Sequence, residues 1–189
     1  MTRTASPDTR TVPDADYSAI VQFYAGHGQL LDAGRAEEWA EQFTEDGVFA
    51  QNVKPDVKRG RADIAAGMRK GIDALAARGL VRRHWFGMIA AEPDGPDTVR
   101  TRYYAVVFET PKGGEPRLYL STTAHDVLER QDGRWYVRSR YISHDGAETI
   151  TPIEAVDLAV EEPVEPAVEA AGSAVAAGVV AGAAVGADA

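Results

Sequence analysis

The residue of this 189-residue sequence best suited to acid–base chemistry is His84, in the segment VRRHWFGM. An imidazole titrates close to neutral pH, so it can take a proton from a substrate and return it. If the segment is a β-strand, alternate side chains point the same way, which places Arg82, His84 and Phe86 on one face. We therefore predict a catalytic role for His84; the alternative is a structural histidine bonded to a backbone carbonyl.

Two carboxylates are candidates for a role beside this histidine. Asp32 follows a pair of leucines at the end of an expected helix, where a carboxylate needs a partner. It could be a general base or orient His84, or it could close the helix-ending turn by pairing with Arg35. In RLYLSTTAHDVLER, alternation places Asp126 on the more apolar strand face, as a candidate acid or base. Asp126 is alternatively a rim or interface residue, and His125 replaces it if the alternation is reversed.

Further side chains are expected to contact a substrate. The candidates are polar or aromatic: Tyr17, Tyr24, His27, Trp39, Phe86, Tyr104 and Thr122. A tyrosine or threonine hydroxyl could hold the oxygen of a developing enolate. Each tyrosine is alternatively a core residue, as is His27, which lies three residues after Tyr24. Trp39 and Phe86 are alternatively core or dimer-surface residues.

Several classes of chemistry have no support in the sequence. It contains no cysteine, no HExxH motif and no histidine pair at ligand spacing, so we expect no metal site. It contains no GxGxxG, P-loop or GxSxG motif, so we expect no nucleotide cofactor and no serine hydrolase. The net charge of −9 disfavours binding to a phosphate backbone, so no nucleic-acid partner is expected.

The elements that must position these residues change from helices to strands along the chain. Apolar residues recur at helical spacing in three segments, 16–31, 35–43 and 61–78. Asp46-Gly47 reads as a turn before a strand that starts at Val48. Four long segments rich in β-branched and aromatic residues then follow, at 81–91, 98–110, 117–130 and 134–144. This order predicts an α+β fold with helices on one face of a curved, mostly antiparallel sheet.

The two ends of the chain differ in composition from the part between them. Residues 151–189 hold seven acidic residues, no Lys or Arg and no aromatic residue, so we expect residues 149–189 to be a disordered acidic tail. Residues 1–14 are expected to be flexible, which leaves one domain over 15–148. The uncharged stretch 170–187 lacks Leu, Phe and flanking cations, so no membrane anchor is expected. No apolar signal-peptide core is present near the N-terminus, and we expect a cytoplasmic protein.

Four segments carry a family resemblance. Residues 23–49, 59–69, 81–88 and 126–142 resemble the SnoaL-like branch of the nuclear-transport-factor-2-like superfamily, over roughly residues 15–146. The resemblance implies a cone of three helices packed in the concavity of a strongly bent sheet, with a deep pocket at the wide end. It also implies a homodimer formed through the outer face of the sheet.

The resemblance extends to single residues. In scytalone dehydratases of this superfamily, an Asp at a helix end supports an acid–base His that stands ahead of an aromatic residue and a glycine. The matching residues here are Asp32 and His84. The sequence departs from that pattern at the second catalytic histidine, whose place is taken by Val107 or Phe108.

The activity implied is that of a cofactor-free dehydratase or cyclase acting on a hydrophobic small molecule, an aromatic polyketide intermediate. His84 would move a proton next to a carbonyl, and Asp32 or Asp126 would orient it or act as the paired carboxylate. Two alternatives stay open: an isomerase of the ketosteroid type, and a non-catalytic module that binds a small ligand or dimerises. An epoxide hydrolase ranks lower, because no Asp–Arg–Asp clamp can be assembled from the sequence.

Overall fold

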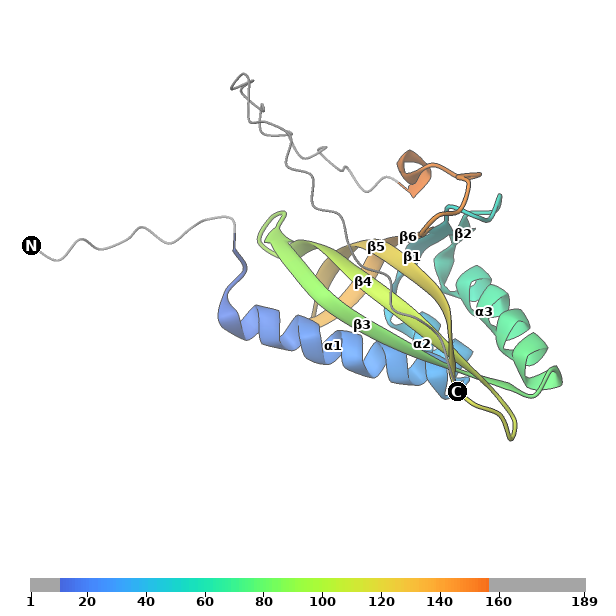
Figure 1. The fold of residues 1–189 in the computed structure, drawn as a ribbon. Helices are drawn as coiled ribbons and strands as arrows, with labels where there is room; N and C mark the ends of the chain where they lie inside the picture. Colours follow the sequence, from blue (N-terminus) through green and yellow to red (C-terminus); the bar gives the residue numbers. More distant parts are fainter. Residues whose placement is uncertain (1–10, 157–189) are drawn as a thin grey trace, which may run out of the picture.

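The computed structural model describes residues 11–156 of the chain. It contains three α-helices, six β-strands and one short 3-10 helix. In chain order they are α1 (Asp14–Asp32), α2 (Ala36–Glu41), β1 (Phe43–Gln51), β2 (Lys58–Arg59), α3 (Gly60–Ala77), β3 (Leu80–Pro93), β4 (Thr98–Pro111), β5 (Arg117–Gln131), β6 (Arg134–His144) and η1 (Ile153–Val156). Helices α1 and α2 lie along one side of the sheet, and α3 stands beside β1 and β2 (Figure 1).

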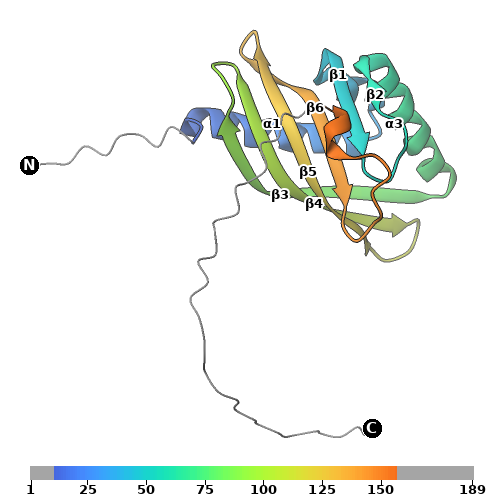
Figure 2. The same cartoon turned by 90° about the horizontal axis from the view of Figure 1, so that it is seen from above.

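The strands form one curved sheet in the order β2-β1-β6-β5-β4-β3. Strands β3 to β6 pair antiparallel with their neighbours in sequence, and β1 joins them by pairing parallel with β6. Figure 2 shows the four long strands side by side, bent over α1. The expected α+β class, with three helices against a strongly curved and mostly antiparallel sheet, is confirmed.

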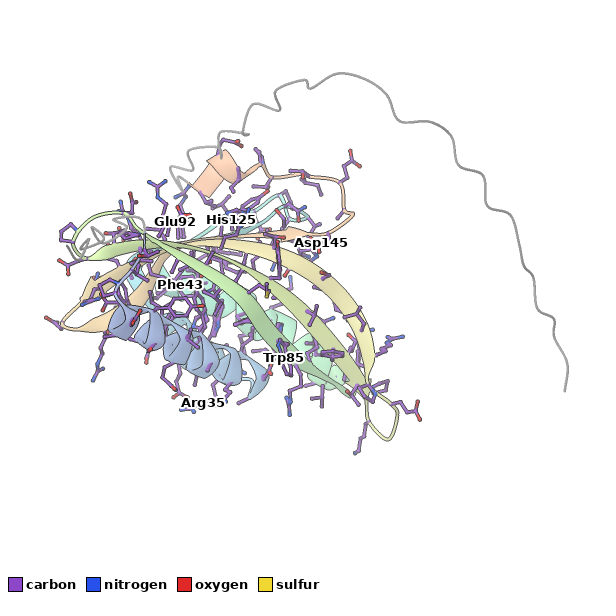
Figure 3. All side chains as sticks on the ribbon, turned by 60° about the vertical axis from the view of Figure 1, so that its left-hand side comes forward. Arg35, Phe43, Trp85, Glu92, His125 and Asp145 are labelled. Carbon is purple, nitrogen blue, oxygen red and sulfur yellow. The ribbon has the colours of Figure 1, made fainter. Side chains whose placement is uncertain are left out.

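The main core lies where α1 and α2 contact the inner face of this sheet. On α1, Ile20, Tyr24 and His27 are buried because their three- and four-residue spacing places them on one side of the helix. Trp39 of α2 and Phe43 pack against His27, with ring centroids 4.9 and 5.8 Å away. In Figure 3, Phe43 lies within the dense group of side chains between α1 and the sheet.

One strand begins earlier than its sequence pattern indicates. The expected turn at Asp46-Gly47 is wrong, because both residues lie inside β1, which starts at Phe43. The pairing of β1 with β6 shifts register between Phe43 and Val48, on either side of Asp46 and Gly47. A Cβ at position 47 would come within 2.8 Å of the Cβ of Phe43, so the glycine serves close packing within the strand.

The packed part of the chain continues beyond the expected boundary at residue 148. Thr151 and Val156 are buried, and Val156 of η1 packs with Ala50 of β1 and Tyr141 of β6. The Tyr141 hydroxyl donates a hydrogen bond to the carbonyl oxygen of Thr151 at 2.7 Å. The expectation of a tail disordered from residue 149 is therefore corrected for 149–156.

The expected flexible segment 1–14 overlaps the described residues at its end, where Val12 packs against the core and Asp14 begins α1. The other expectations about the termini fall on residues 1–10 and 157–189, which lie outside the described residues and include the stretch 170–187. Within the described part of the chain, none of the helices combines the length and the hydropathy that a membrane span requires. The cytoplasmic location stays a prediction.

Candidate active site

His84 and Asp32 come together where the end of α1 meets β3. The Asp32 carboxylate accepts a hydrogen bond from the His84 ring, with 2.7 Å between Oδ1 and Nδ1. The same carboxylate accepts from the backbone N–H of His84, at 3.2 and 3.3 Å. The side chains of His84 and Asp32 are 20% and 13% exposed, so the pair is sheltered but reachable.

The geometry selects one tautomer of the neutral His84 ring. An ionised carboxylate only accepts hydrogen bonds, so the ring proton lies on Nδ1 and Nε2 carries a free lone pair. Within the described residues, Nε2 of His84 makes no hydrogen bond. The arrangement can therefore take up a proton at Nε2 while Asp32 stabilises the imidazolium that forms.

One aromatic side chain lies next to this pair. Phe86, on the same strand face, has its ring centroid 6.4 Å from that of His84 and packs on Tyr103 at 5.3 Å. On α3 only Ile64 is buried, while Met68 and Ile72 of the same apolar face keep part of their surface exposed. Two surface grooves of about 530 and 560 Å³ lie elsewhere and include neither His84 nor Asp32. The deep pocket expected around the pair stays a prediction.

Asp126 lies in a separate, fully buried network. Its Oδ1 accepts from Nε of Arg140 at 2.9 Å, and its Oδ2 accepts from Nη2 at 2.6 Å. Arg140 also donates from Nη1 to Nε2 of His27 at 2.8 Å. The proton of His27 is therefore on Nδ1, which donates to Oε1 of Gln42 at 2.7 Å. Burial and then the charge of Arg140 lower the pKa of His27 well below its usual value, so this ring is neutral.

Two hydroxyls complete the network. The Tyr24 hydroxyl donates to Oδ2 of Asp126 at 2.8 Å and lies 2.5 Å from Oγ1 of Thr101. Burial, followed by the negative charge of Asp126, raises the pKa of Tyr24 well above its usual value, so the hydroxyl keeps its proton. Burial by itself lowers the pKa of Arg140, but the opposing effect of the Asp126 charge and of neighbouring groups is larger, so the pKa of Arg140 is raised overall and its guanidinium stays charged. Each polar group here has a protein partner.

The structure therefore separates the three predicted catalytic residues. It brings Asp32 to His84, as one of the sequence interpretations requires. It holds Asp126 in the core, where it is 2% exposed and its oxygens are bonded to Arg140 and Tyr24. This environment fits a structural role for Asp126, and its expected action on a substrate stays a prediction.

The predicted substrate-binding residues are also separated by the structure, into residues of the core, of the outer sheet face and of the neighbourhood of His84. Tyr24, His27 and Trp39 are at most 1% exposed and belong to the core, and their expected contact with a substrate stays a prediction. Tyr104 is 50% exposed on the outer sheet face, opposite the face that carries His84. Of the seven predicted substrate-binding residues, only Phe86 lies next to His84.

The other two hydroxyl candidates are already bonded. Tyr17, near the opposite end of α1, donates to the carbonyl of Ile89 at 2.9 Å. Thr122 lies on the inner face but donates to the carbonyl of Ala105 at 3.2 Å. Neither hydroxyl is free to hold an enolate oxygen in this structure.

Arg140 was missed by sequence reasoning. Strict alternation from the buried Trp135 and Val137 of β6 would turn Ser139 inward and Arg140 outward. A register shift between β5 and β6 at Val127/Leu128 reverses this parity, so Arg140 pairs with Asp126 on the inner face. No motif in the sequence predicts this register shift. The only indication of it is that the neighbouring strands carry opposite charges, Asp126 on β5 and Arg140 on β6.

The described residues contain no cluster of side chains that could bind a metal ion. Over residues 11–156, no group of three His, Cys, Asp or Glu side chains is close enough together to bind a metal ion. The expectation of chemistry without a cofactor stays a prediction.

Comparisons with known proteins show the family and agree with the fold. Residues 15–141 match the model of a family described as a SnoaL-like domain. No curated protein matches the sequence. Among solved structures, Aln2 from a Streptomyces species is similar with 29% identity and a TM-score of 0.67, over 72% of this chain and 95% of that one.

Two further structures are similar at slightly higher identity. ActVI-ORFA from Streptomyces coelicolor is 31% identical with a TM-score of 0.66, over 71% of this chain and 98% of that one. A protein from Catenulispora acidiphila in complex with S-DNPA is 33% identical with a TM-score of 0.62, over 70% of this chain and 96% of that one.

Proposed function

The chain belongs to the SnoaL-like family, and from this premise we propose that it is a cofactor-free enzyme that removes a proton next to a carbonyl of an aromatic polyketide intermediate. Loss of a β-hydroxyl or closure of a ring completes the reaction. The observation that carries the proposal is the 2.7 Å hydrogen bond between Asp32 and His84, with Nε2 of the ring unoccupied. A bound small molecule in the relative from Catenulispora acidiphila supports a small-molecule substrate.

The dehydration needs a single base. Nε2 of His84 takes the α-proton, and the electrons of the broken C–H bond form an enolate. The imidazolium is stabilised by the Asp32 carboxylate through Nδ1–H, which holds the ring in place during the transfer. The enolate then expels the β-hydroxyl, which takes the proton back from Nε2 and leaves as water. Protons balance, and the enzyme returns to its starting state.

The test is turnover of an aromatic β-hydroxy ketone followed by mass spectrometry. We expect a product lighter by one water, and a His84→Ala variant slower by roughly 10²–10⁴-fold, the range typical of general acid–base catalysis. Asp32→Asn should lower kcat as well, because the ring loses its fixed tautomer. His125→Ala is the matched control, since His125 faces away from the inner sheet face.

The outcome also separates the alternatives. A product of unchanged mass favours an isomerase of the ketosteroid type. Unimpaired turnover by His84→Ala removes this histidine from the mechanism, and no turnover of any hydroxy ketone favours a non-catalytic binding module.

We further propose a homodimer formed through the outer face of the sheet. Trp85 and Leu118 are 70% and 62% exposed there, and Tyr104 and Phe108 continue the same apolar area on β4. An exposed apolar area of this kind marks an interaction surface. Trp85→Asp should convert a dimer to a monomer in sedimentation experiments, whereas Val21→Asp, at an exposed position on α1, should not. A monomeric wild-type protein would contradict this proposal.

A further inference from the structure

A cluster of charged side chains lies on the inner sheet face next to the Asp32–His84 pair. Arg82, Glu109 and Arg117 occupy directly paired positions on β3, β4 and β5. Glu109 accepts from Nη2 of Arg82 at 2.9 Å and from Nη2 of Arg117 at 2.8 Å. Arg82 stands two residues before His84 on the same strand face, which places their Cα atoms about 7 Å apart.

In this cluster the negatively charged side chain is buried and the two positively charged side chains are partly exposed. The side chain of Glu109 is 1% exposed, whereas those of Arg82 and Arg117 are 23% and 64% exposed. Hydrogen bonds from Arg117 and then Arg82 lower the pKa of Glu109, so it is ionised at neutral pH. One carboxylate cannot neutralise two guanidinium groups, so the three residues present a net charge of +1 toward the solvent side of the inner face.

Arg82 is held in place with part of its donor capacity unused. Its Nε and Nη2 both donate to the same oxygen of Glu109, at 3.2 and 2.9 Å. Its guanidinium lies over the ring of Tyr119, 4.0 Å from the ring centroid, which fixes its plane. Among the described residues, Nη1 of Arg82 has no hydrogen-bond partner. A preorganised guanidinium with free N–H groups is suited to bind a carboxylate.

We propose that Arg82, assisted by Arg117, binds a carboxylate group of the substrate, so that the molecule acted on at His84 is a ketone that also carries a carboxylate rather than an uncharged ketone. Glu109 is a positioning residue that holds the two guanidinium groups, one on each of its carboxylate oxygens. The link to turnover rests on the proposed function, whereas the binding of a carboxylate does not. A purely structural ion-pair network is the competing explanation.

Binding of two matched probes tests the proposal. Naphthylacetate and naphthylacetamide have nearly the same shape and differ in charge, and titration calorimetry on the full chain measures both. We expect the acid to bind roughly ten- to a hundredfold more tightly than the amide, the range for hydrogen bonds to a charged group. Arg82→Gln should remove most of this preference, and Arg117→Gln part of it.

Controls keep the result specific. Arg138→Gln, at an exposed position on β6, should leave the preference unchanged. Arg82→Gln leaves Glu109 paired with Arg117, so the variant should fold, and thermal unfolding verifies this. Arg82→Lys keeps the charge but loses the planar fork, so it should recover only part of the preference.

Equal binding of acid and amide by the wild type, binding of neither at millimolar concentration, or a preference that survives in Arg82→Gln overturns the proposal. The two proposals fail separately. If the acid is preferred but His84→Ala turns over normally, the carboxylate site stands and the catalytic assignment is lost. If acid and amide bind equally, the carboxylate site is lost whatever the turnover shows.

Discussion

At the scale of single residues, the two carboxylates Asp32 and Asp126 have opposite environments. Asp32 bonds to a ring that is partly exposed, so the pair can meet a substrate. Asp126 and Arg140 form an ion pair whose side chains are 0% and 2% exposed. Moving two charges out of water costs several kcal/mol per ion, and the extra bonds from Tyr24 and to His27 help to offset that cost. The same residue type is therefore accessible to a ligand at one position and enclosed in the core at the other.

The structural role of Asp126 predicts a loss of stability on substitution. Asp126→Asn leaves the buried guanidinium of Arg140 without its counter-charge, so we expect the free energy of unfolding to fall by about 3–5 kcal/mol. Urea denaturation measures the change. Asp145→Asn is the matched control, because Asp145 is exposed and should change stability little. A stable Asp126→Asn protein that has lost turnover would return Asp126 to the list of catalytic residues.

At the scale of elements, the site depends on how closely α1 lies against β3. A Cβ built at Gly28 of α1 would be 3.3 Å from Cε2 of Phe86, which is tighter than ordinary contact. Phe86 cannot easily retreat, because its ring packs on Tyr24 and Tyr103, at 6.3 and 5.3 Å between centroids. The lack of a side chain at position 28 thus sets the spacing between the helix that carries Asp32 and the strand that carries His84.

Two glycine substitutions on the same helix test this spacing. At Gly26, where a Cβ would meet nothing within 4 Å, Ala should stabilise the protein by about 0.5–1 kcal/mol through helix propensity. At Gly28 the same gain should be outweighed by about 1–3 kcal/mol of overpacking. Thermal unfolding of both variants measures the difference. Equal effects of the two substitutions would show that Phe86 moves freely and that α1 does not depend on Gly28.

At the scale of the whole molecule, the histidines make stability depend on pH. Burial and then Arg140 lower the pKa of His27, and burial is the largest cause that lowers the pKa values of His125 and His144. Below a pH of about 6.5 these rings bind protons more readily in the unfolded chain than in the folded one. The stabilisation is therefore present above that pH and is lost progressively as the pH falls toward the folded-state values.

The expected size of this effect is about 1.4 kcal/mol of unfolding free energy per pH unit for each histidine that stays neutral in the fold. Urea denaturation between pH 7.5 and pH 5, above the range in which most carboxylates titrate, measures the slope. His27→Gln removes the contribution of one histidine, so the pH dependence of the unfolding free energy should become shallower by about 1.4 kcal/mol per pH unit. This expectation does not depend on how the substitution changes stability at neutral pH. An unchanged slope in this variant would mean that His27 can be protonated within the folded core.

The local pattern of residue types along the sequence was sufficient to predict most of the helices and strands of this protein. Helical spacing identified α1 and α3 to within two residues, and runs of β-branched and aromatic residues located β3 to β6. The chemistry of His84 and the position of Asp32 after two leucines singled out the pair that the structure brings into contact. The helices and strands depend on neighbours within a few residues along the chain, so composition and periodicity carry them, whereas the pairing of Asp32 with His84 was also implied by the family resemblance.

Tertiary structure decided what depends on partners far apart in sequence. The inward position of Arg140 follows from a register shift between β5 and β6, and the early start of β1 follows from its parallel pairing with β6. The roles of Tyr24 and His27 were set by Asp126 and Arg140, more than 100 residues away. A strand's side-chain parity reverses with one extra residue, and only the packing of the completed sheet determines where that residue is accommodated.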